Sequence, residues 1–166
     1  MSSEQYFRSP REWVKKVVEH LEQALSIRIK TSYQRCAKEL TSTQISYLVG
    51  EVEPVNSFSN DGRAKHNIEL RFLVEVPTSI NEFDLEALDA STRVERELSN
   101  EFFNVGDDLE ESVLVSNLPS RFNPELGVFA RTVTFKQTIR MGPIAETAIE
   151  LAGVESDAVD ESVTGS

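Results

Sequence analysis

The stretch GVFARTVTFKQTIRM, from Gly127 to Met141, constrains the fold of this chain more than any other part of the sequence. Apolar side chains occupy one parity and small or polar side chains largely occupy the other, which is the period of two of a half-buried strand. At about 3.3 Å per residue the strand would extend over roughly 45 Å, compared with about 17–20 Å for a usual strand. A single domain of this size has little use for such a length. We therefore expect the strand to contribute to a subunit interface as well as to the core.

Length and charge favour one acidic globular domain with an extension. The chain has 166 residues, of which 39% are hydrophobic and 27% charged, and its formal net charge is −11. No Lys, Arg or His follows Arg140, whereas that last part of the chain carries several acids. We expect a domain over residues 1–141 and an acidic extension over 142–166. The negative balance argues against a protein that grips nucleic-acid phosphates, because such proteins neutralise phosphates with clustered cations.

Two amphipathic helices are expected. The first begins at Ser9, where SPRE has the form of a capping box with Pro10 at the first helical position, and its apolar stripe starts at Trp13. The second is capped at Ser79 or Asn81 and ends before Gly106. Its expected buried stripe consists of Leu85, Leu88, Val94, Leu98 and Phe102, packed on the sheet.

Strands are expected at QISYLVGEVEP (44–54), NIELRFLVEVP (67–77) and SVLVSNL (112–118), before the long strand. Apolar residues on both parities of 44–54 suggest a central strand that is covered on both faces. The segment 26–44 has no decisive pattern. This order predicts an α+β fold, with a mostly antiparallel sheet and two main helices packed on one face.

No catalytic signature is found in the sequence. The nucleophile elbow, the Walker loop, the dinucleotide fingerprint and the zinc-protease motif are all missing from it. His20 and His66 are expected at the surface, and Cys36 is expected to be an idle thiol. The acidic turn GDDLEE (106–111) could attract a divalent ion, but the calcium-loop spacing is absent, so a solvated turn is preferred. We expect no enzyme activity, no cofactor and no metal site.

Localisation signals are also weak. The polar start MSSEQYFRSP lacks the apolar core of a signal peptide, and no apolar run is long enough to cross a membrane. These features favour a cytoplasmic protein that makes no membrane contact.

Contact candidates come from three regions of the sequence. In the turn-rich segment 55–66, either a projecting contact loop or a plain solvent-exposed loop is possible. The connection 119–127 contains two prolines, and the aromatic residues around it could either anchor a binding partner or form the rim of the core. The long strand supplies outward polar positions. The candidate contact residues are Phe58, Arg63, Lys65, Arg121, Phe122, Phe129, Arg131, Thr134 and Lys136.

The layout resembles the tail-terminator proteins of long-tailed bacteriophages, which are also called minor tail or tail-completion proteins. The likeness is carried by REWVKKVVEHLEQAL, by NIELRFLVEVPTSINEFDLEALDASTRVERELSN and by the closing strand ARTVTFKQTIRM, which ends with the basic Arg140. It spans about residues 9–141. The extension 142–166 and the segment between the first helix and the first clear strand depart from the family pattern.

The resemblance implies an α/β domain that assembles into a hexameric ring on the head-proximal end of the tail tube, where it stops tube growth. Implied partners are other copies of the chain, the tail tube protein, a neck or head-completion protein and possibly the tail sheath. DNA would pass through the lumen without specific binding. The implied location is the tail-head junction of the virion, with assembly in the host cytoplasm. Two alternatives stay open: another tail or neck ring component, or a small cytoplasmic enzyme or adaptor with the same outline.

The acidic extension is expected to dock on a neighbouring subunit or another protein of the junction. By composition it should be disordered when free, because it offers little apolar surface to offset the entropy of ordering. On the partner, Ile144, Ile149, Leu151 and Val154 would anchor it, with a short helix begun by Pro143 and ended by Gly153.

Overall fold

The computed structural model describes residues 7–34, 40–55, 64–99, 103, 109–110 and 112–142, with the side chain of Arg121 excepted. The elements are α1 (Pro10–Leu25), β1 (Lys30–Thr31), a short 3-10 turn (Ser32–Gln34), β2 (Gln44–Pro54), β3 (Ala64–Pro77), α2 (Phe83–Leu98), β4 (Val113–Asn123) and β5 (Val128–Met141). The expected α+β class is confirmed. The expected helix at 143–153 lies outside the described residues.

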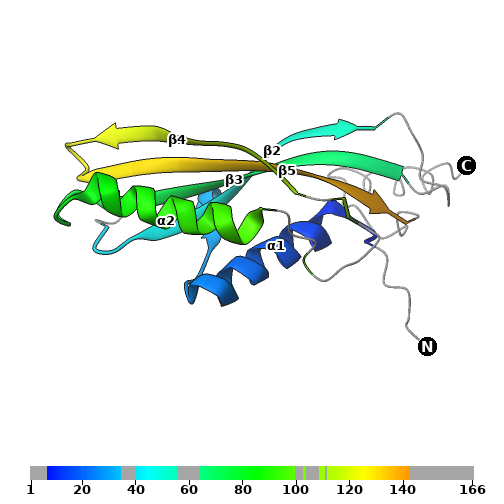
Figure 1. Ribbon diagram of the computed structural model, residues 1–166, viewed down its shortest axis with the longest axis horizontal. Coiled ribbons are helices and arrows are strands. Elements are labelled where there is room, and N and C mark those ends of the chain that lie inside the picture. Colours follow the sequence, from blue (N-terminus) through cyan, green and yellow to red (C-terminus); the bar gives the residue numbers. More distant parts are fainter. Residues whose placement is uncertain are drawn as a thin grey trace, which may run out of the picture.

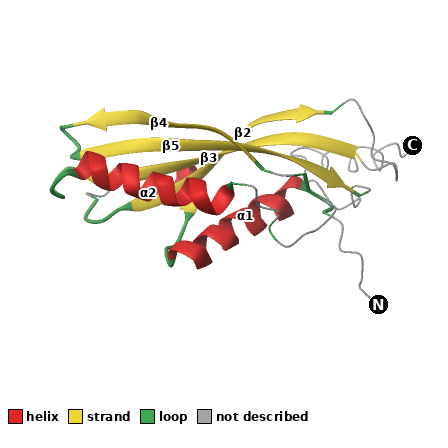
Figure 2. Cartoon of the chain, in the orientation of Figure 1, coloured by secondary structure: helices red, strands yellow, loops and turns green. Residues whose placement is uncertain are grey.

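The five strands form one sheet in the order β1-β2-β3-β5-β4. The pairs β2–β3, β3–β5 and β5–β4 are antiparallel, and only the short β1 runs parallel to its neighbour β2. Both helices pack on the same side of the sheet, as Figures 1 and 2 show. We call that side the helix face and the opposite side the open face. The expectation of a mostly antiparallel sheet with two helices on one face is confirmed.

The length of β5 is used inside the domain, which corrects the expectation that a lone domain has no use for it. β3 is equally long, and the two strands pair from Ala64 opposite Met141 to Pro77 opposite Val128. On its other side β5 pairs with β4 from Lys136 to Val128. Because β5 has neighbours on both sides, its backbone along the β4 ladder has no edge to offer to another subunit. The sequence reasoning missed this because it began β3 at Asn67 and not at Ala64.

The core lies between the helix face and the two helices. Residues directly opposite each other in an antiparallel pair share a face, so Ile68, Leu70, Phe72, Val74 and Val76 of β3 face the helices together with the odd-numbered residues of β5. All five of these β3 side chains are fully buried. The indole of Trp13 sits at the centre of this layer, with its ring centroid 5.8 Å from that of Phe135.

Two polar side chains of β5 also point to the helix face. The sequence pattern placed polar residues on the other parity, but Arg131 and Gln137 share the parity of the apolar set. Each has partners there. Trp13 donates its indole N–H to Gln137 Oε1 at 2.7 Å, and Arg131 donates from Nε to Asn117 Oδ1 at 3.0 Å. Because these groups are hydrogen-bonded, their burial carries a small net cost.

Helix α1 begins where the sequence predicts, with Ser9 as N-cap and Pro10 in the first turn. The capping box does not form as expected, because Ser9 makes no side-chain cap hydrogen bond. The carboxylate of Glu12 instead accepts from the backbone N–H of Arg8 at 2.7 Å, one residue earlier than the box requires. The stripe that starts at Trp13 is buried as predicted, down to Leu21.

The buried face of α2 differs from the expected one. Its buried residues are Ala87, Ser91, Val94 and Leu98, whereas Leu85 is 48% and Leu88 is 42% exposed. Phe102 lies outside the described residues. The sequence reasoning chose the largest apolar side chains, but the small Ala87 and Ser91 occupy the face that meets the sheet. The helix begins at Phe83 after Glu82, so neither Ser79 nor Asn81 is its cap.

This burial pattern changes the expected cost of substitutions in α2. If Leu88 were buried, as the sequence predicts, Leu88→Ala would lower the free energy of unfolding by about 2–5 kcal/mol. Because Leu88 is exposed, we expect a loss of less than about 1 kcal/mol. Val94→Ala, at a fully buried position, is expected to lower it by about 2 kcal/mol. Urea unfolding of the two variants checks the order. A larger loss for Leu88→Ala would contradict the packing of this helix.

Strand β2 is not the central strand that its apolar pattern suggested. The register shifts between Val49 and Val52, which pair with Leu70 and Ile68 respectively. This β-bulge turns both valines to the helix face, although their numbers differ in parity. An apolar run on two parities was therefore the signature of a bulged strand near the sheet edge.

Candidate functional site

Exposed apolar side chains gather at the two lateral edges of the sheet. Of the large apolar residues that are exposed in the described part of the chain, eight lie on β4, on the adjacent face of α2 or in the β4–β5 turn. Three more lie on β2 or directly after it, and the last is Tyr33. We call the first group the β4 surface; it comprises Leu85, Leu88, Val113, Leu114, Val115, Leu118, Phe122 and Leu126.

The β4 surface belongs to an edge strand that is apolar on both of its faces. Val113 and Leu118 are each 60% exposed and pair opposite the open-face residues Lys136 and Thr132. Leu114 and Phe122 pair opposite helix-face residues of β5. Within the described residues, β4 has no strand on its outer side. β4 carries Pro119, Arg121 and two register shifts, which are features that protect an edge, but most of its exposed side chains are apolar. It is therefore a candidate surface for contact with another chain.

An aromatic cluster supports the end of the β4 surface. Phe83 of α2 stacks on Phe122 with ring centroids 6.1 Å apart and nearly parallel planes, and its centroid lies 5.7 Å from that of Phe129. Phe129 is partly buried against the core, whereas Phe122 is 58% exposed. The two candidates from the sequence are thus brought together, but only Phe122 is presented to solvent.

The second apolar edge is that of β2. Strand β1 pairs only with Ser46 and Tyr47, so no described strand covers β2 from Leu48 to Pro54. Next to this free stretch lies a pocket of about 500 Å³ between β2 and the start of α1. We call it the β2 pocket; it is lined by Pro10, Arg11, Val14, Lys15, Tyr47, Val49, Val52 and Ile68. The floor of the pocket is apolar, and its two basic residues, Arg11 and Lys15, lie on the exposed side of α1.

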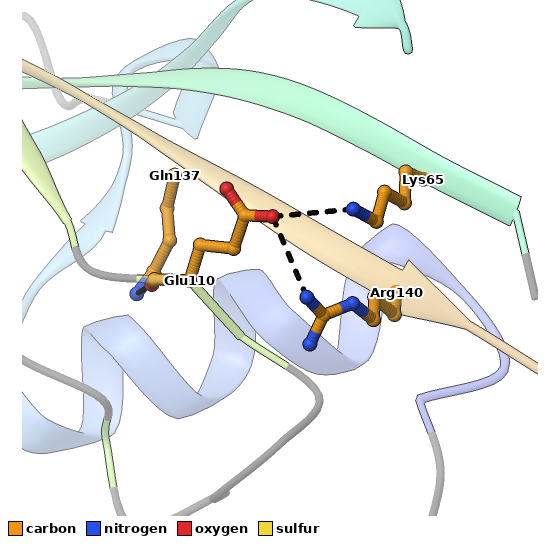
Figure 3. Close-up of polar contacts among 4 residues, drawn as sticks. All are labelled: Lys65, Glu110, Gln137 and Arg140. Atoms are coloured by element: carbon orange, nitrogen blue, oxygen red, sulfur yellow. Dashed lines mark hydrogen bonds and ion pairs between the residues drawn. The ribbon is translucent and has the colours of Figure 1, made fainter. Parts of the chain in front are cut away.

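A polar cluster holds the segment that precedes β4, as Figure 3 shows. The carboxylate of Glu110 lies 3.4 Å from Lys65 Nζ and 3.5 Å from Arg140 NH2. The carbonyl of Glu110 accepts from Gln137 Nε2 at 2.8 Å, and its N–H donates to the carbonyl of Thr138 at 3.0 Å. Each partly exposed ion pair contributes at most about 1 kcal/mol, but together the contacts fix the segment against β5.

The remaining candidates from the sequence are dispersed. Lys65 is a residue of β3 and not of a loop, Thr134 is buried at the centre of the open face, and Lys136 is half-buried on that face. Arg131 is bonded to Asn117 beneath the sheet. None of these residues forms part of the β4 surface or the β2 pocket. Phe58, Arg63, Ile144, Ile149 and Leu151 lie outside the described residues, as does the side chain of Arg121.

The two histidines are less exposed than expected. His20 lies edge-on to Phe103 with ring centroids 5.3 Å apart, and its Nε2 is 3.7 Å from a carboxylate oxygen of Glu97. His66 is half-buried in β3, and its Nδ1 has no hydrogen-bond partner among the described residues. Across the described ranges, no group of three or more His, Cys, Asp or Glu residues is placed to hold a metal ion. None of the described helices is long and apolar enough to cross a membrane.

Sequence reasoning missed both edges as sites. The run VLV at 113–115 was interpreted only as a short strand, although apolar residues on both parities, together with Leu118 and Phe122, do signal a two-sided apolar strand. No signal in the sequence could have located the β2 pocket, because it depends on the bulge in β2 and on where α1 crosses the sheet.

Comparison with known proteins relates this chain to a virus-like particle by fold. No protein-family model matches the sequence, and no curated protein sequence matches it. The fold is similar to that of a chain in the structure "Virion of native gene transfer agent (GTA) particle", with a TM-score of 0.53 and 12% sequence identity. The alignment covers 75% of this chain and 91% of that chain. At this level of identity the similarity concerns the fold.

Proposed function

We propose that this chain is a structural virion protein of a phage-like particle, and that copies of it form a ring at the head-proximal end of the tail tube. The ring ends polymerisation of the tube and provides the surface for the neck or head-completion protein. The observation that carries the proposal is the pair of apolar edges on opposite sides of one sheet. The fold that the chain shares with a component of a gene transfer agent virion supports it.

Two different edges on one subunit suit a ring. When one edge binds the other edge of the next copy, the contact is heterologous, and a rotation that closes gives a ring of fixed size. Six copies, as in the tail-terminator family, is the number we propose. In this role the chain needs no cofactor and no catalytic group. DNA would pass the lumen without being held, and a contractile tail would add the sheath as a partner.

Electron microscopy of the purified chain, alone and mixed with preformed tail tubes of the same phage, tests this function. We expect rings of uniform diameter, and we expect them on one end of each tube, where they prevent further addition of tube subunits. Tubes incubated without the chain serve as the control and should keep growing. If the chain polymerises into tubes by itself, it is a tube protein. If it stays monomeric and never binds tube ends, the proposed function is wrong.

A further inference from the structure

The strand directions of this sheet determine how two copies can meet. Because β2–β3, β3–β5 and β5–β4 are antiparallel pairs, β2 and β5 run one way, and β3 and β4 run the other way. If a second sheet is placed beside the first by translation, so that its helices stay on the same side and its strands keep their directions, β4 of one copy adjoins the β2 edge of the next. The two strands are then antiparallel, which is the orientation with the better hydrogen-bond geometry.

We infer that β4 of one copy adds to the free stretch of β2 in a second copy, from Leu48 to Pro54, as an antiparallel strand. The inference rests on the proposed ring and names the surfaces that build it. Backbone groups at both edges, which have no described strand opposite them, would become paired, except at Pro119, which has no N–H to donate. β-Strand addition of this kind takes its affinity from main-chain hydrogen bonds and its specificity from side-chain pockets.

The side chains of the two edges match on both faces. On the helix face, the incoming β4 presents Leu114 toward the β2 pocket, where Val49 and Val52 are only half covered. On the open face, Leu118 comes next to Leu48. The eleven residues of β4 are more than enough to cover the free stretch of β2 from Leu48 to Pro54. Apolar surface is thereby removed from water on both sides of the new ladder.

Charge favours the same arrangement. Antiparallel addition brings the beginning of β4 to the Pro54 end of β2, where α1 also begins, since Phe7 bridges Met141 and Met141 lies opposite Ala64. Arg11 and Lys15 line the β2 pocket near this end. The described acid that precedes β4, Glu110, is 45% exposed. It would approach these cations of the next copy, which favours this orientation over the reverse.

A second copy is a better occupant than an unrelated chain because one subunit supplies both halves of the contact. A symmetric β4–β4 dimer would bury the β4 surface but leave the β2 pocket in water. The head-to-tail contact buries both, and the open assembly keeps one free β4 edge at one end and one free β2 edge at the other until the ring closes.

Paired edge variants test the inference. The β4 variant carries Val115→Lys and Leu118→Lys, and the β2 variant carries Val49→Lys and Val52→Lys; all four positions are exposed in the single subunit. Lysine on an edge blocks strand addition. The matched control carries Gln23→Lys and Ala24→Lys on the exposed side of α1. Circular dichroism verifies folding, and light scattering after size exclusion measures the mass of each species.

The expected masses differ for each arrangement. Each edge variant alone should be monomeric, and the control should form the wild-type ring. An equal mixture of the two variants should stop at a dimer, because only one intact β2 edge and one intact β4 edge can meet. Rings formed by the β2 variant alone, or a mixture that stays monomeric, would overturn the inference. If a double variant does not fold, Val52→Lys and Leu118→Lys are used singly, with the same expectations.

The proposed function can fail separately. If the wild-type chain forms no ring with or without tail tubes, the function is wrong, whatever the variants do. If wild-type rings form and both edge variants also form them, the function stands and the contact between β4 and β2 is wrong.

Discussion

Trp13→Ala is expected to lower the free energy of unfolding by about 3–5 kcal/mol. The indole is fully buried between α1 and the sheet, and its removal leaves a cavity next to Phe135. It also removes the donor that is hydrogen-bonded to the buried side chain of Gln137. Stability falls for both reasons. In urea unfolding we expect a lower midpoint concentration, with an unchanged dependence of the unfolding free energy on urea concentration.

Trp13→Phe separates the two contributions. Phenylalanine keeps an aromatic ring near Phe135 but has no N–H for the amide oxygen of Gln137. We expect this variant to lie between the wild type and Trp13→Ala. A loss of about 1–3 kcal/mol is typical for a buried polar group that loses its partner. If Trp13→Phe were as stable as the wild type, the hydrogen bond to Gln137 would contribute nothing.

Thr134→Pro is expected to prevent folding of the domain and not only its assembly. Thr134 lies in the middle of β5, opposite Arg71 on one side and Ser116 on the other. Proline cannot donate to either ladder, and it is otherwise confined to edges, strand ends and bulges. The chain follows this rule itself, since Pro119 lies on the edge strand β4 and both Pro54 and Pro77 end their strands.

The matched control for this variant is Thr134→Val, which keeps a β-branched side chain and the backbone N–H. It should fold with a far-ultraviolet circular dichroism spectrum like that of the wild type, whereas Thr134→Pro should lose the strand signal and aggregate. A folded, soluble Thr134→Pro chain would mean that β5 is not paired at this position.

Much of the fold follows from local patterns in the sequence. The start of α1, the bounds of β2 and the alternation of β5 are all visible in neighbouring residues, because periodicity reports which face of an element is buried. The expectations failed where distant parts of the chain decide the outcome. Ala87 and Ser91 meet the sheet because of how α2 crosses it, so the larger Leu85 and Leu88 are left outside.

The candidate site was less predictable than the fold. An edge strand is defined by the absence of a neighbour, and strand order is a property of the whole sheet. The length and alternation of β5 led us to expect a subunit interface there, yet β5 lies inside the sheet, and β4, with the weaker pattern, lies at the margin. Of the contact candidates named from the sequence, Phe122 is the one whose described side chain lies on the β4 surface.

Irregular pairing is restricted to the margins of this sheet. The ladder between β3 and β5 runs without a break, whereas β2 shifts between Val49 and Val52, and β4 shifts at two places. Gly50 lies inside the shifted part of β2, where a Cβ atom would meet the carboxylate of Glu69 unless that side chain moved. Bulges increase local twist and bend a strand. The subunit therefore has a regular central plate, formed by β3 and β5, between two bent borders, and in the proposed ring both contacts would be made by these borders.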